Sequence, residues 1–198
     1  TFATLGAFLK YPKPSLPKKP SLHVADKKFS FFRQQKNQFD ELVAHLELIP
    51  LNKEESRYCR HPLAYLVEAA DDICYTIIDL EDATNLGWID EDKSIELLNP
   101  FIKDKFDWKI YNNLSRKNER LSYLRALSIN GLITEARHQF ISNEENIISG
   151  KMSKPLLKAS SFSPAIDEII DYSVKHIYQS REVTQKEIAG YQILNELL

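Results

Sequence analysis

The stretch that decides the fold runs from His61 to Asp82 and reads HPLAYLVEAADDICYTIIDLED. Its apolar residues gather on one arc when successive residues are turned by about 100°, which predicts an amphipathic helix. The arc contains Leu63, Leu66, Val67, Ala70, Ile73, Cys74 and Ile77. Pro62 suits the first helical turn, and Gly87 suits a left-handed cap just past the end. We therefore expect one long helix from Pro62 to about Leu86.

The opposite arc of this helix is acidic and contains Glu68, Asp71, Tyr75, Asp79 and Asp82. Asp71, Tyr75 and Asp79 are spaced i, i+4 and i+8, so they follow one stripe over roughly 12 Å. Neighbouring carboxylates on a helix repel each other, and no Lys or Arg occurs between Pro62 and Asp92 to offset them. A metal ion, or basic side chains from elsewhere in the fold, would relieve this repulsion. The alternative is a solvated acidic face with a chance tyrosine.

Helical periodicity also marks the chain on both sides of this stretch. Further helices are expected at 1–10, 29–48, 90–98, 118–148, 163–178 and 184–198. Loops are expected at 11–20, which carries four prolines, at 49–60 and at 151–161, while 100–117 is mixed. Asn99-Pro100 is expected to end the helix that begins at Asp90. The whole chain, 1–198, therefore reads as a single all-α segment with no convincing internal boundary.

Composition narrows the class of protein. The 198 residues are 43% hydrophobic and 27% charged with a formal net charge of -2, so no basic field indicates nucleic acid. No apolar run approaches the roughly 18 residues of a membrane span. Cys59 and Cys74 form no CxxC pattern, which favours a reducing compartment such as the cytoplasm. Cys74 is expected in the core because it lies on the apolar arc.

The central stretch resembles a signature of bacterial deoxyguanosinetriphosphate triphosphohydrolases (dGTPases), which are all-helical enzymes of the HD superfamily. The resemblance rests on RHPLAYLVEAADDICY at 60–75 and IDLED at 78–82. It extends to TLGAF at 4–8, KFSFF at 28–32, LSYLRA at 121–126 and EIAGY at 187–191. These matches occur in order along nearly the whole chain, so the resemblance implies an HD-like helical bundle throughout.

The resemblance also implies an activity. The family hydrolyses a deoxynucleoside triphosphate, with dGTP as the expected substrate, to a deoxynucleoside and triphosphate. It uses a divalent metal ion, Mg²⁺ or Mn²⁺, held by H…HD…D ligands. The last Asp of that set matches Asp71, and the Tyr and Asp that contact the deoxyribose match Tyr75 and Asp79. Family members form homo-oligomers, so this chain is expected to do the same.

The chain departs from the family pattern in one respect. None of its five histidines is followed by Asp, so the first His and the His-Asp pair of the metal motif are missing. The first residue is Thr1 rather than Met. We therefore expect a C-terminal portion of a longer enzyme, with the other metal ligands and the general base outside this chain. A single carboxylate is too few ligands to hold the metal well.

Basic residues offer further candidates for substrate binding. Arg125 lies in an apolar neighbourhood, so it is expected to bind an anion, either the triphosphate or a carboxylate of an acidic helix. Lys28, beside Lys27, could contact phosphates or be solvated. The cluster of Arg116, Lys117 and Arg120 has the same two interpretations. No Gly-rich phosphate loop, Walker lysine or Ser-His-Asp arrangement is visible.

Two other functions compete with the hydrolase. The chain could be a non-catalytic helical module that binds nucleotide weakly or contacts other subunits, which the missing H and HD motifs favour. An HD phosphodiesterase acting on other phosphoesters is the third interpretation. Tyr75 together with Asp79 favours a deoxynucleoside substrate over that alternative.

Overall fold

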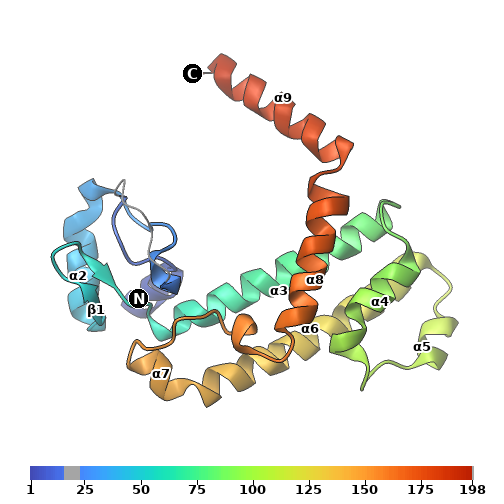
Figure 1. Ribbon diagram of the computed structural model, residues 1–198, viewed down its shortest axis with the longest axis horizontal. Helices are drawn as coiled ribbons and strands as arrows, with labels where there is room; N and C mark the ends of the chain where they lie inside the picture. Colours follow the sequence, from blue (N-terminus) through green and yellow to red (C-terminus); the bar gives the residue numbers. More distant parts are fainter. Residues whose placement is uncertain (16–22, 198) are drawn as a thin grey trace. The chain divides into compact units, whose positions relative to one another are not determined.

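Helices make up most of the chain in a computed structural model that describes residues 1–15 and 23–197 (Figure 1). Within these ranges the β-structure consists of a two-stranded sheet and one isolated bridge. The all-α class expected from the sequence is confirmed. Residues 16–20 of the expected proline-rich loop, and Leu198 of the last expected helix, lie outside the described residues.

The chain divides into two compact units. The first contains Thr1–Asp72 and Ile133–Ser160, and the second contains Ile73–Leu132 and Ser161–Leu198. Two long helices, α3 (Pro62–Asn85) and α6 (Lys117–Ser142), contribute residues to both. None of the helices in the described ranges combines the length and hydrophobicity that a membrane span requires.

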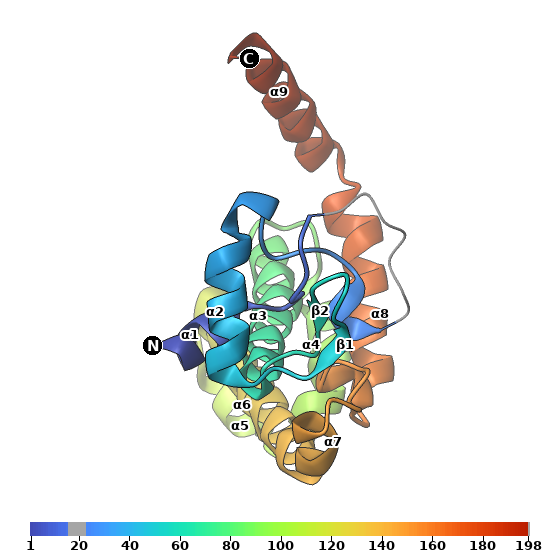
Figure 2. The same ribbon diagram turned by 90° about the vertical axis from the view of Figure 1, so that its left-hand side faces the viewer.

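The first unit is built on short helices and a hairpin. Besides parts of α3 and α6 it contains α1 (Phe2–Phe8), η1 (Val24–Asp26), η2 (Arg33–Gln35), α2 (Lys36–Leu46), β1 (Pro50–Asn52), β2 (Arg57–Tyr58), α7 (Glu144–Ile148) and η3 (Leu157–Ala159). Helices α1 and α2 contact each other (Figure 2). The approach is close, because a Cβ at Gly6 would lie 2.6 Å from the Leu46 side chain. Phe39 of α2 also stacks on Phe31, with ring centroids 3.9 Å apart.

The second unit is wholly helical in its described residues. It combines parts of α3 and α6 with α4 (Glu91–Ile102), α5 (Trp108–Asn113), α8 (Ser163–Ser173), the π-helix η4 (Val174–Tyr178) and α9 (Arg181–Leu197). Leu80, Leu124 and Ile169 are completely buried in its core. Gly131 lets α6 approach α4, because a Cβ there would lie 2.6 Å from the Phe101 carbonyl oxygen. No residue of α9 is buried.

Several helix boundaries differ from the sequence expectations. Helix α4 continues through Pro100 to Ile102, because burial of Phe101 and Ile102 retains the last turn despite the missing donor. The helix expected from Phe29 begins only at Lys36. The expected loop at 49–60 contains the antiparallel hairpin, which pairs Pro50 with Tyr58.

Other differences lie in the second half of the chain. Helix α5 occupies part of the segment read as mixed, and the long helix expected to reach Ile148 is interrupted between α6 and α7 at Asn143. The helix expected from Ser163 to Tyr178 changes to a π-helix after Ser173.

Candidate functional site

Helix α3 carries the candidate residues, and its ends follow the sequence closely. The ring of His61 accepts a hydrogen bond from the backbone N–H of Leu63 at 3.2 Å, which satisfies an otherwise free donor of the first turn. Gly87 has φ 78°, the left-handed conformation expected just past the end. The helix runs without interruption from Pro62 to Asn85, so residues four apart lie on successive turns.

The buried face of α3 differs from the predicted apolar arc. Leu63, Val67 and Cys74 are exposed, whereas Glu68, expected on the acidic face, is 5% exposed. The expectation that Cys74 lies in the core is therefore wrong. The burial of Glu68 has a physical reason in Arg60, which precedes the helix and pairs with the carboxylate, offsetting the free energy lost when the carboxylate leaves water.

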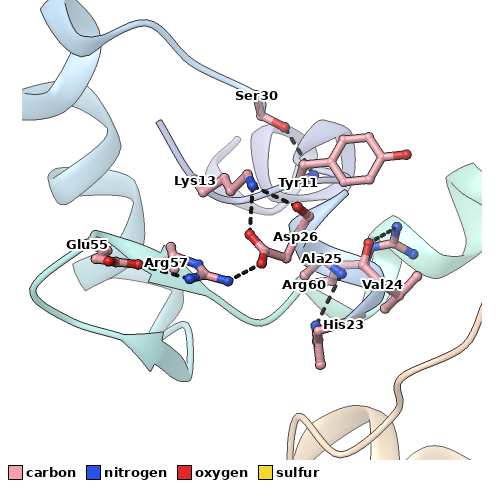
Figure 3. A network of polar contacts seen from close by, with 10 residues as sticks. All are labelled: Tyr11, Lys13, His23, Val24, Ala25, Asp26, Ser30, Glu55, Arg57 and Arg60. Atoms are coloured by element: carbon pink, nitrogen blue, oxygen red, sulfur yellow. Dashed lines mark hydrogen bonds and ion pairs between the residues drawn. The ribbon is translucent and has the colours of Figure 1, made fainter. Parts of the chain in front are cut away.

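Arg60 is the centre of a buried polar network in the first unit. Its Nη1 donates to Glu68 Oε2 at 2.5 Å and its Nη2 donates to Glu68 Oε1 at 3.2 Å. Its Nε also donates to the carbonyl oxygen of Lys10 at 2.7 Å. Its Nη2 donates to the carbonyl oxygen of Val24 at 3.1 Å, a contact drawn in Figure 3. These four contacts pair the buried guanidinium of Arg60 with the carboxylate of Glu68 and with two backbone acceptors.

The same network continues through Asp26, which is 1% exposed. Lys13 Nζ donates to Asp26 Oδ1 at 2.7 Å, and Arg57 donates to Asp26 Oδ2 (Figure 3). Arg57 also donates to Glu55 Oε2 at 2.9 Å. These contacts fasten the hairpin and η1 to the segment that carries Arg60, so the network serves the fold.

Asp71 lies one turn beyond Glu68 and has a different environment. Its side chain is 78% exposed, and Lys10 Nζ lies 4.0 Å from Asp71 Oδ2 but 3.3 Å from Glu68 Oε1. Burial, and then the negative charge of Glu68, raise the pKa of neighbouring Asp72 to about 6. The positive charges of Lys10 and Arg60 act against these two effects and lower the pKa of Asp72.

The carboxylate of Asp71 is chemically suited to be one ligand of a metal ion. Carboxylate oxygen is a ligand that Mg²⁺ and Mn²⁺ prefer. Among residues 1–15 and 23–197, no group of three or more His, Cys, Asp and Glu side chains could hold a metal ion. The donor set therefore fits a divalent metal only if further ligands come from outside this chain.

Tyr75 and Asp79 occupy the next turns of α3, within the second unit. Tyr75 is 47% exposed. Asp79 Oδ2 accepts a hydrogen bond of 2.5 Å from the hydroxyl of Tyr178, which belongs to η4. The rings of Tyr75 and Tyr178 stack with centroids 5.6 Å apart and planes 19° from parallel. The structure thus joins two expected residues to a third that sequence reasoning missed, because nothing local to Tyr178 distinguishes it from a core aromatic.

Arg125 forms an ion pair with α3. Its Nη1 lies 2.9 Å and 2.8 Å from the two carboxylate oxygens of Glu81, whose side chain is 9% exposed. This pairing is the salt bridge to an acidic helix that the sequence left open as an alternative. Contact of Arg125 with a triphosphate stays a prediction. Lys28 is exposed, and its contact with phosphate also stays a prediction.

The second basic cluster takes part in contacts within the second unit. Lys117 donates to the carbonyl oxygen of Thr84 at the end of α3. Arg120 donates through Nε and Nη2 to the two oxygens of Glu91, at 2.6 Å and 2.8 Å. Arg116 lies 4.0 Å from Glu119. Lys117 and Arg120 thus take part in the fold, whereas the Arg116 side chain is 76% exposed, and contact of this cluster with phosphate stays a prediction.

The comparisons with known proteins agree with the resemblance seen in the sequence. No protein-family model matches the chain. The whole chain is similar to a deoxyguanosinetriphosphate triphosphohydrolase-like protein of a Synechocystis species, at 34% identity over 208 residues and 45% of that protein. A protein of the same description from Listeria monocytogenes is 32% identical over the whole chain and 43% of its own length. The deoxyguanosinetriphosphate triphosphohydrolase of Yersinia pestis is 32% identical over the whole chain and 42% of its length. The chain therefore spans less than half the length of these relatives.

Proposed function

We propose that this chain, which is related over its whole length to deoxyguanosinetriphosphate triphosphohydrolases, forms part of a metal-dependent dNTP triphosphohydrolase. The observation that carries the proposal is the order of Asp71, Tyr75 and Asp79 on successive turns of α3. An exposed carboxylate, a half-exposed aromatic ring and a second carboxylate suit a metal ion, a sugar face and a sugar hydroxyl, respectively.

The proposed reaction is hydrolysis of dGTP to deoxyguanosine and triphosphate. Water adds to the α-phosphorus, the bond from that phosphorus to the 5′-oxygen breaks, and the oxygen leaves as the protonated 5′-hydroxyl. A bound Mg²⁺ or Mn²⁺ supplies Lewis acidity at the phosphate. Asp71 contributes one ligand to that ion, and the remaining ligands and the general base come from residues outside this chain.

Tyr75 and Asp79 orient the deoxynucleoside in this proposal. The exposed part of the Tyr75 ring packs against the sugar, where a 2′-hydroxyl would be crowded. The Asp79 carboxylate accepts a hydrogen bond from the 3′-hydroxyl. Since a buried polar group that loses its partner costs free energy, this arrangement discriminates among sugars. By analogy with the family, the enzyme is a cytoplasmic homo-oligomer.

The test is an activity measurement on the full-length protein. With dGTP and Mn²⁺ or Mg²⁺, Asp71→Ala is expected to lower triphosphate release by at least about 100-fold, because a metal ligand is lost. Asp82→Ala is the matched control, since Asp82 is another exposed acidic residue of α3. Full activity in Asp71→Ala would contradict the assignment.

The second candidate is a non-catalytic helical module. It is favoured by the finding that the described residues contain no complete metal-binding group. Triphosphate release by the 198-residue chain, measured beside the full-length protein, separates the two. Turnover by the full-length protein supports the enzyme, whereas inactivity of both proteins favours the module.

A further inference from the structure

Helix α8 does not simply end but widens into a π-helix. The backbone N–H of Gln179 donates to the carbonyl of Val174 at 3.0 Å, a bond that spans five residues and not four. Buried Ile177 anchors this turn. A π-turn changes the direction in which the following side chain points, and such turns recur at functional sites. Here the side chain at the end of the turn is Tyr178.

Tyr178 contacts both α3 residues assigned to the sugar. Its hydroxyl donates to Asp79 Oδ2 at 2.5 Å, and its ring lies against the ring of Tyr75. All three side chains belong to the second unit. A single residue from another helical segment is therefore positioned to fix the orientation of two neighbours on successive turns of α3.

The donor and acceptor of the hydrogen bond between Tyr178 and Asp79 can be assigned. Burial, followed by hydrogen bonds to Asp79 and Tyr75, raises the pKa of the Tyr178 hydroxyl well above its usual range. A phenolic O–H donates and a carboxylate accepts, so the hydroxyl of Tyr178 is the donor and Asp79 Oδ2 the acceptor. The bond engages Oδ2, which leaves Oδ1 of the same carboxylate to accept a hydrogen bond from a ligand.

We propose that Tyr178 is a positioning residue of the sugar-binding subsite, holding Asp79 for the 3′-hydroxyl and supporting Tyr75 against the sugar. This proposal rests on the proposed function and adds to it a residue from outside α3. Tyr178 does not touch the reacting atoms. Its effect reaches the substrate through the carboxylate that it orients and the ring that it supports.

The experiment uses Tyr178→Phe in the full-length protein, because this change removes the hydroxyl and keeps the ring. Catalytic efficiency, kcat/KM, is measured for dGTP and for 2′,3′-dideoxy-GTP, which lacks the 3′-hydroxyl. The preference for dGTP over the dideoxy compound is expected to fall about tenfold, since Asp79 is no longer held as an acceptor. Tyr172→Phe is the matched control, because Tyr172 lies on α8 and stacks on His176 instead. It should keep the wild-type preference.

A double-mutant cycle separates positioning from a general effect on folding. If Tyr178 acts through Asp79, Tyr178→Phe should leave the preference unchanged in an Asp79→Asn background. An unaltered preference in Tyr178→Phe alone, or the same loss in both backgrounds, would overturn the proposal. If the wild-type protein releases no triphosphate from dGTP, the proposed function fails and this role fails with it. An active wild type with an unaltered variant overturns the Tyr178 role alone.

Discussion

The buried polar network of the first unit and the exposed face of α3 use the same kinds of side chain in opposite ways. Glu68 is enclosed and paired with Arg60, whereas Asp71, one turn further along, is 78% exposed and lies 4.0 Å from Lys10. A buried charge is tolerated only when it is paired and hydrogen-bonded, as Glu68 is by Arg60. A charged side chain exposed to solvent can instead bind a ligand. Whether a charged side chain is paired within the protein therefore separates residues that stabilise the fold from residues suited to binding.

The largest effect is expected from breaking the buried pair. Arg60→Met should lower the free energy of unfolding by about 3 kcal/mol, because buried Glu68 loses both hydrogen bonds from Arg60 and keeps only Lys10, at 3.3 Å. Urea unfolding followed by circular dichroism measures the change. The double variant Arg60→Met, Glu68→Leu should recover much of the loss, since both charges are then gone. A loss below about 1 kcal/mol in the single variant would show that Glu68 finds water or another partner.

A partly exposed ion pair in the second unit should give an intermediate effect. Hydrogen bonding from Arg120 lowers the pKa of Glu91 from its ordinary 4.5, assisted by Tyr111 and opposed by burial. Stability from a lowered carboxyl pKa is present above the unfolded value and is lost as the pH falls through the folded value. Glu91→Gln should therefore cost about 1 kcal/mol at pH 7, and the cost should shrink below pH 4.5. Urea unfolding at several pH values tests this, and a cost independent of pH would contradict it.

The smallest effect on stability is expected at the exposed carboxylate. With a chelator present, Asp71→Ala should change the free energy of unfolding by no more than about 0.5 kcal/mol. The same substitution is expected to lower triphosphate release by at least about 100-fold. Thermal unfolding of the variant beside the wild type provides the measurement. A loss of about 2 kcal/mol or more would place Asp71 with Glu68 among residues that hold the fold.

Local sequence signals predicted α3 well because they lie within it. Pro62 and Gly87 marked its ends, and the structure has the helix from Pro62 to Asn85. The buried face could not be predicted from α3 alone. Arg60, which lies outside α3, pairs with Glu68 and allows this carboxylate to be buried, while Val67 and other apolar residues of the helix are exposed.

The candidate site was predictable only in part. Periodicity placed Asp71, Tyr75 and Asp79 on one stripe, but it left a solvated face equally open, and the family resemblance supplied their expected roles. Tyr178 lies 99 residues from Asp79 in the sequence. The contact between them depends on a π-turn that no local sequence pattern predicts. Contacts of this kind follow from tertiary packing, so one sequence without its fold does not reveal them.

The two cysteines carry a consequence for chemical labelling. Cys59 is buried, its Sγ lies 3.6 Å from the carbonyl oxygen of Gly150, and burial raises the pKa of its thiol. Gly150 has φ 71°, and a Cβ there would lie only 2.7 Å from that sulfur, so the turn closes tightly over it. Cys74 is exposed. An alkylating reagent should therefore modify Cys74 at once and Cys59 only when the turn at Gly150 opens. The rate at which Cys59 is modified would therefore measure how often the first unit opens transiently.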